Sequence, residues 1–183
     1  MTFPFFTIGH SSRGFVEFVE LLRDAQIQCV VDVRAFPRSR THPQFNESTL
    51  PDALLPFDVS YEHMADLGGR RRVSGLVPPE TNGLWENQSF HNYADYAFTE
   101  PFHAGLEHLI ALGRTRRCVI MCSEAVWWRC HRRIIADYLI ARNEPVFHIM
   151  GKGQVSAAQL TLGAVITLAR AVTYPALIEP QPP

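Results

Sequence analysis

The stretch FFTIGHSSRGFVEFVELLRDAQIQCVVDVR, residues 5–34, indicates the fold of this 183-residue chain. It opens on a short apolar run at 5–9 and closes on another at 29–33, and both are almost continuous in apolar character. Strands that are buried on both faces have this composition. Between the two runs, apolar residues recur at the i, i+3, i+4, i+7 spacing of an amphipathic helix, which Ser11 or Ser12 would cap. The stretch therefore predicts strand, helix, strand.

The same order continues along the chain. Apolar runs at 118–122 and 145–150 predict two more buried strands, and a weaker, alternating run at 58–64 predicts another. Helices are expected at 101–112, with a proline in the first turn, and at 126–142. Buried strands that are linked through helices pair in parallel by right-handed crossovers. We therefore predict an α/β fold, a three-layer sandwich around a central, mostly parallel, Rossmann-like sheet.

A single domain, 1–174, is expected to contain nearly the whole chain. This length is enough to bury about two-thirds of the surface of the unfolded chain. Residues 68–92 contain glycines, prolines and asparagines without periodicity, and they predict a long loop or lid. The proline-containing end, 175–183, predicts a disordered tail.

The composition is that of an ordinary water-soluble protein, with 46% hydrophobic and 19% charged residues. No apolar run approaches the roughly 20 residues of a membrane span, and no secretory signal is recognised, so we expect a cytoplasmic protein without a membrane partner. A net charge of −1 argues against a surface that coats nucleic acid, and nucleic acid is not the favoured partner. The basic residues are nevertheless unusual, because 16 of the 17 are arginine.

The four cysteines are expected to be free thiols, since a cytoplasmic protein rarely has a disulfide framework. Cys29 and Cys118 each begin a predicted strand and are expected to be small buried residues. Cys130 shares a helical spacing with Ile134 and Tyr138, which predicts that it belongs to the core.

Reactive residue types follow the predicted strands at their carboxyl ends, where open parallel sheets bind ligands. We expect four residues to supply reactive groups: His10, Asp32, Cys122 and Glu124. We expect eight others to bind the substrate: Ser11, Arg13, Arg34, Arg38, Ser39, Arg70, His131 and Arg132. The planar guanidinium group suits two-pronged binding of phosphate or carboxylate. Together these residues predict a pocket for a small anionic molecule or a nucleotide.

Several short motifs carry a resemblance to a known family. They are TIGHSSR (7–13), VVDVRAFPRSR (30–40), QFN (44–46), YEHMADLGGRR (61–71), YADY (93–96), MCSE (121–124) and CHRRIIADYL (130–139). In their order and spacing they resemble the bacterial and archaeal family known as domain of unknown function 488. The resemblance implies a polar pocket built from these motifs, and it implies no particular reaction.

Two chemistries are compatible with the predicted pocket, and both make the protein a hydrolase or a transferase. In the first, Cys122 ends a strand that leads into a helix N-terminus, and the helix end and nearby arginines favour a reactive thiolate. In the second, Asp32 and Glu124 act as acid, base or nucleophile, while arginines bind an anionic substrate.

Two further alternatives stay open. One is a metal-dependent hydrolase with Cys122 and His10 as ligands and Cys130 as a third. It is the weaker alternative, because C-x7-C-H is not a common zinc spacing and neighbouring helical residues point about 100° apart. We therefore predict no cofactor. The other is a non-catalytic module that binds a nucleotide or single-stranded nucleic acid. The oligomeric state cannot be predicted from the sequence.

Overall fold

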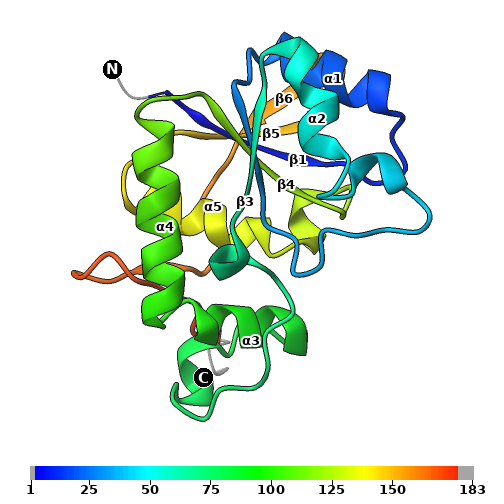
Figure 1. Ribbon diagram of the computed structural model, residues 1–183. Coiled ribbons are helices and arrows are strands. Elements are labelled where there is room, and N and C mark those ends of the chain that lie inside the picture. Colours follow the sequence, from blue (N-terminus) through cyan, green and yellow to red (C-terminus); the bar gives the residue numbers. More distant parts are fainter. Residues whose placement is uncertain (1–2, 177–183) are drawn as a thin grey trace.

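The computed structural model describes residues 3–176 and contains a six-stranded sheet in the order β3-β2-β4-β1-β5-β6 (Figure 1). The first five strands pair in parallel, and β6 is antiparallel to β5. The prediction of a mostly parallel sheet is confirmed. The strands are β1 (Phe5–Gly9), β2 (Cys29–Asp32), β3 (Ser60–His63), β4 (Cys118–Cys122), β5 (Val146–Gly151) and β6 (Gln154–Ala157).

Helices cover both faces of this sheet, so the three-layer α/β sandwich is also confirmed (Figure 1). One face carries α1 and α2, and the other carries α4 and α5. The helices are α1 (Phe15–Asp24), α2 (Leu50–Leu54), α3 (Gln88–Tyr96), α4 (Glu100–Gly113) and α5 (Arg132–Ala141). Among the described residues, no helix is both long and apolar enough to span a bilayer.

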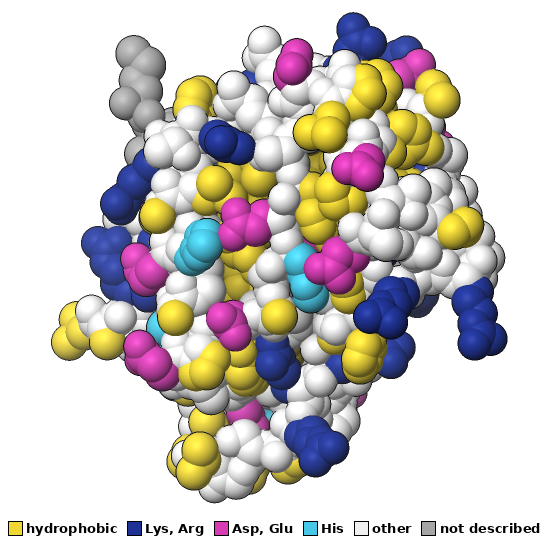
Figure 2. Space-filling model, viewed as in Figure 1, with side chains coloured by type: hydrophobic (Ala, Val, Ile, Leu, Met, Phe, Trp, Pro, Cys, Tyr) yellow, Lys and Arg dark blue, Asp and Glu magenta, His cyan; other side chains and the backbone are white. Residues whose placement is uncertain are grey.

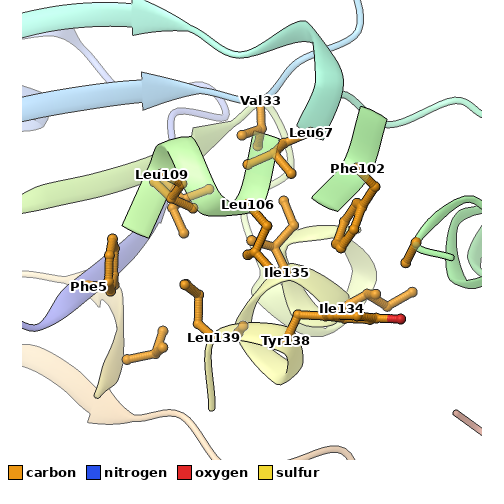
Figure 3. Packing of buried hydrophobic residues seen from close by; sticks show 14 of the residues in the cluster. Phe5, Val33, Leu67, Phe102, Leu106, Leu109, Ile134, Ile135, Tyr138 and Leu139 are labelled. Carbon is orange, nitrogen blue, oxygen red and sulfur yellow. The ribbon is translucent and has the colours of Figure 1, made fainter. Parts of the chain in front are cut away.

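Alternate residues of each central strand enter the two cores, because successive side chains of a strand point to opposite faces. In β4, Ile120 packs against α4 and α5, whereas Val119 and Met121 pack against α1 and α2. Figure 3 shows the first of these cores, where Leu106 and Leu109 of α4 face residues of α5. Burial on both faces explains why these strands are continuous apolar runs in the sequence.

Two details of the predicted helices are wrong. The N-cap of α1 is Gly14, with no side-chain cap, so neither Ser11 nor Ser12 caps this helix. The helix expected at 126–142 begins only at Arg132. Before it, Trp127–Arg129 form a single 3₁₀ turn and Cys130 is extended. The Trp127 ring stacks on His148 at a centroid distance of 4.3 Å, and this tertiary contact accompanies the irregular path.

The segment 68–92 is less irregular than the sequence predicts. It contains a 3₁₀ turn at Pro79–Asn82, and α3 begins at Gln88 within it. Asn87 caps α3, because its side-chain oxygen accepts hydrogen bonds from the backbone N–H groups of Ser89 and Phe90.

The chain beyond β5 adds structure that the sequence did not predict. A small antiparallel pair, β7 (Val165–Ile166) and β8 (Val172–Thr173), follows β6. The Tyr174 hydroxyl donates a 2.9 Å hydrogen bond to Asp137 of α5, which fixes this segment to the main domain. The tail predicted at 175–183 lies, after 176, outside the described residues.

Candidate functional site

A cavity of about 850 Å³ opens at the carboxyl edge of the sheet. Its wall includes 10–12, which follow β1, and 122–125, which begin at the last residue of β4. These two strands are neighbours, yet β1 leads to α1 on one face of the sheet and β4 leads to α5 on the other. Such a change of side opens a crevice between adjacent strand ends, and open α/β sheets bind ligands there.

A buried ion pair lies beneath this cavity. The Arg34 guanidinium donates from Nε to both carboxylate oxygens of Asp32, at 2.9 and 3.0 Å, and the Tyr61 hydroxyl donates to the same carboxylate at 2.7 Å. Asp32 is fully buried and is not part of the cavity wall. Although burial opposes the charge of Arg34, the hydrogen bonds and charge of Asp32 raise its pKa. Asp32 therefore fixes Arg34 and has no oxygen directed at a ligand.

His10 is held as a neutral ring at the cavity wall. Its Nδ1 lies 3.0 Å from the Ser11 carbonyl, which can only accept, so the proton is on Nδ1. Its Nε2 can then accept from Arg34 Nη1 at 3.3 Å. Burial, with a smaller contribution from the charge of Arg34, lowers the pKa of His10 to about 4. The ring also stacks on Phe45 at a centroid distance of 4.4 Å.

Three side chains that we call the Cys–His cluster meet at another part of the wall: Cys122, Cys130 and His131. One sulfur or nitrogen atom of each lies within 4.8 Å of the other two. The His131 ring is oriented by its Nε2, which lies 2.9 Å from the Val33 carbonyl. Arg132 is 1% exposed and donates from Nε to Cys130 Sγ at 3.2 Å.

The pKa values of the two cysteines in this cluster are shifted in opposite directions. The hydrogen bond with Cys130 and burial raise the pKa of Cys122 to about 12. Burial alone would raise the pKa of Cys130, but the hydrogen bond from Cys122 and the charge of Arg132 outweigh burial and lower it to about 6. The more acidic thiol is therefore Cys130, whereas the sequence predicted Cys122.

Three exposed arginines of the wall, which we call the cavity arginines, are Arg38, Arg70 and Arg129. Within residues 3–176 their guanidinium groups make no hydrogen bond and no ion pair. Arg70 lies against the ring of Phe36, 5.7 Å from its centroid, and has a left-handed backbone with φ of 58°. Glu124 is the only acidic residue of the described cavity wall. The cavity is therefore suited to an anion.

Most of the predicted site residues meet in this cavity. Nine of the twelve line it: His10, Ser11, Arg34, Arg38, Ser39, Arg70, Cys122, Glu124 and His131. Three do not: Arg13, Asp32 and Arg132. Arg13 donates to the carbonyls of Gly9 and Met150, and Arg132 donates to Cys130 and the Glu124 carbonyl. These two arginines hold the walls together instead of facing a ligand.

The structure brings together a different set of potential metal ligands from the set expected from the sequence. His10 contacts Arg34 and Phe45, whereas His131 is the histidine beside the two cysteines. From the sequence, Cys130 and His131 were expected to be neighbours on a helix, where their side chains would rarely reach one metal ion. Because Cys130 is extended, with φ of −127° and ψ of 145°, the angle between helical neighbours does not apply.

Part of the wall was not predicted at all. Ser89 and Phe90 of α3 and His42 of the loop after β2 line the cavity, whereas Tyr93 of α3 was implied by the family resemblance alone. The signal that could have located α3 is Asn87, an N-cap residue directly before the helix.

Among the comparisons with known proteins, the comparison with protein families gives a match. No curated protein and no solved structure matches the chain. The family described as domain of unknown function DUF488 matches residues 15–139. This range includes Arg34, the cavity arginines and the Cys–His cluster, and leaves out His10. The chain therefore belongs to the DUF488 family, as the sequence motifs indicated.

Proposed function

We propose that the protein is an enzyme that binds a phosphorylated or nucleotide-like anion in the carboxyl-edge cavity and transforms it beside the Cys–His cluster. One observation carries this proposal: arginines that form no hydrogen bond or ion pair with the described residues line the same cavity as buried sulfur atoms. Free cysteines are in keeping with the cytoplasmic location expected from the sequence, because that compartment keeps thiols reduced.

The charges of the wall support an anionic substrate. Arg34 is balanced by Asp32, but the three cavity arginines face a single acidic residue, Glu124. Each guanidinium can offer two parallel N–H donors to a phosphate group. The hydroxyl-bearing residues Ser11 and Ser12, beside these charges, can add neutral hydrogen bonds.

Sulfur chemistry is better supported than carboxylate chemistry. Both oxygens of Asp32 are already hydrogen-bonded inside the protein. Glu124 lines the cavity and Asp32 does not, so the two carboxylates do not face a shared ligand there. Cys122 and Cys130, in contrast, are both buried and both part of the wall.

A non-catalytic module that binds nucleic acid is less well supported. Trp85, Trp127 and Trp128 do not line the cavity, and Trp127 is already stacked on His148. In Figure 2, Lys and Arg side chains are scattered, and acidic and hydrophobic side chains lie between them. A nucleic-acid surface would instead present a continuous basic stripe, which this face does not show.

The test is a panel of ribose phosphates and nucleoside mono- and diphosphates, with binding measured by calorimetry and turnover by phosphorus NMR. We expect at least one compound to bind and to be converted. Arg70→Gln should weaken that binding about tenfold, the size of one lost charged hydrogen bond. Cys130→Ala should abolish turnover, whereas Cys118→Ala, at the far end of β4, should preserve it.

Binding without any turnover would contradict the enzyme proposal and support a binding module. Equal binding by wild type and by a variant with Arg38, Arg70 and Arg129 all changed to Gln would contradict the anion site itself.

A further inference from the structure

We propose that the Cys–His cluster binds a zinc ion, held by Cys122, Cys130 and His131, with a fourth coordination position open to the cavity. The binding of zinc is independent of the proposed function, and only its catalytic use rests on that function. A zinc ion in this position would act as a Lewis acid on a phosphorylated substrate.

The spacing of the donor atoms fits a tetrahedral ion. Zinc lies about 2.3 Å from a cysteine sulfur and about 2.0 Å from a histidine nitrogen, so two such atoms on one tetrahedral ion are roughly 3.6 Å apart. Cys130 Sγ and His131 Nδ1 are 3.7 Å apart. Cys122 Sγ lies within 4.8 Å of Cys130 Sγ and of a ring nitrogen of His131. Small side-chain rotations would therefore bring all three onto one ion.

The His131 ring presents the correct nitrogen. Its Nε2 is 2.9 Å from the Val33 carbonyl, and a carbonyl can only accept a hydrogen bond, so Nε2 carries the proton. The lone pair of the neutral ring is then on Nδ1, on the side of Cys130. Metal-binding histidines typically donate their other ring N–H to a carbonyl or a carboxylate in this way.

Gly69 leaves room beside that nitrogen. A Cβ atom at position 69 would lie 2.9 Å from His131 Nδ1 and 3.1 Å from its Cε1, against the ring and closer than Cβ atoms approach other heavy atoms. The backbone of Gly69 is not left-handed, so the conformation does not require glycine. The absence of a side chain is therefore explained by the close packing of Gly69 against the His131 ring, which sets the position of Nδ1.

The charges of the cluster suit a divalent metal ion that binds soft ligands such as thiolates. Two thiolates and one Zn²⁺ sum to zero, so binding of the ion would add no net charge to the buried cluster, and an added buried charge is costly. Arg132 donates to Cys130 Sγ and stabilises a thiolate at that position. Thiolate and imidazole ligands together favour zinc over magnesium or calcium.

The chain contains a second cysteine pair that serves as a comparison. Cys29 and Cys118 are buried Cα partners at the opposite end of β2 and β4. No histidine joins them in a three-ligand group among the described residues. All members of the Cys–His cluster, in contrast, line the cavity. Three protein ligands with one open position are typical of catalytic zinc, and four protein ligands of structural zinc.

The experiment is a titration of the reduced, metal-free protein with Co²⁺ and then with Zn²⁺ against a chromophoric chelator. We expect one equivalent of Co²⁺, with thiolate charge-transfer absorption and the intense visible bands of a tetrahedral ion, and displacement by Zn²⁺. Cys122→Ala, Cys130→Ala and His131→Gln should each weaken zinc binding by about a hundredfold or more. Cys118→Ala, the matched control, should leave zinc binding unchanged.

Gly69→Ala keeps all three ligands and tests the geometry if a ligand variant fails to fold. Because its methyl group would crowd Nδ1, we expect zinc binding about tenfold weaker, at the lower end of losses for residues around a metal ligand. Failure to bind one equivalent of Zn²⁺, equal loss in Cys118→Ala, or a stable Cys122–Cys130 disulfide in place of the ion would overturn the proposal.

Binding of inorganic pyrophosphate to the metal-free protein separates the two proposals. If pyrophosphate binds and zinc does not, only the metal site is refuted. If zinc binds and pyrophosphate does not, the anion site of the proposed function is refuted and the metal site stands.

Discussion

At the scale of the residue, the burial of His148 has a consequence for stability. His148 is 2% exposed, its Nδ1 lies 2.8 Å from Thr7 Oγ1, and its ring stacks on Trp127. Burial and then the charge of Arg132 lower its pKa from 6.5 to about 4. The folded protein therefore keeps the ring neutral, while the unfolded chain binds a proton below about pH 6.5. The contribution of His148 to stability is complete at neutral pH and is lost as the pH falls toward 4.

We predict that His148→Gln makes the free energy of unfolding less dependent on pH. In urea titrations, the difference in the free energy of unfolding between wild type and variant should be about 2 kcal/mol smaller at pH 4.5 than at pH 7. The matched control is His108→Gln, because His108 is 59% exposed on α4. Parallel curves for wild type and His148→Gln would show that the neutral, buried ring is not the cause.

Individual site residues were easier to predict by position than by role. Residues after strand ends, such as Cys122 and Arg34, were found because the strands were predictable. Asp32 occupies a comparable strand end, but its oxygens are taken up by Arg34 and Tyr61. Partners that are remote in sequence decide such roles, since Tyr61 reaches Asp32 from β3.

At the scale of the element, β1 and the loop after β4 touch where the cavity begins. A Cβ atom on Gly9 would lie 1.9 Å from the Glu124 carbonyl oxygen and 2.9 Å from that of Ala125. Both are backbone atoms, and backbone hydrogen bonds from His10 and Ser11 to 122–123 hold the loop in place. The loop therefore has little freedom to move away.

We predict that Gly9→Ala lowers the free energy of unfolding by about 3 kcal/mol, the upper range for an overpacked site. Urea titration at pH 7 measures it. Gly14→Ala is the matched control, because a Cβ there meets nothing within 4 Å; it should change stability by less than about 1 kcal/mol. Similar losses in the two variants would contradict the close approach of β1 and the loop.

Elements with a strong apolar pattern could be predicted, and elements without one could not. The buried strands β1, β2, β4 and β5 are marked in the sequence by apolar runs, and the edge strand β3 by a weaker alternation. β6 is exposed at all four positions, so it leaves no apolar run. The start of α5 was misplaced because Trp127 and Cys130 pack by tertiary contacts that a local spacing does not contain.

At the scale of the whole molecule, the strand order creates the site. Placing β1 between β4 and β5 brings the segments after Gly9 and Cys122 side by side, although they are far apart in the sequence. The sequence predicted a parallel sheet but not this order, which depends on long-range pairing. The order is what unites the cavity arginines, His10 and the Cys–His cluster.

If the cavity concentrates anions at its sulfur atoms, as we propose, the alkylation of its cysteines shows this without a known substrate. Iodoacetate is an anion and iodoacetamide is neutral, so the ratio of their rates at Cys122 and Cys130 in the metal-free protein reports the local potential. We predict that the ratio of the iodoacetate rate to the iodoacetamide rate is several-fold higher at these cysteines than for glutathione. This ratio should fall with added salt, and it should fall when Arg38, Arg70 and Arg129 are changed to Gln. A ratio equal to that of glutathione, unchanged in the arginine variant, would contradict the account.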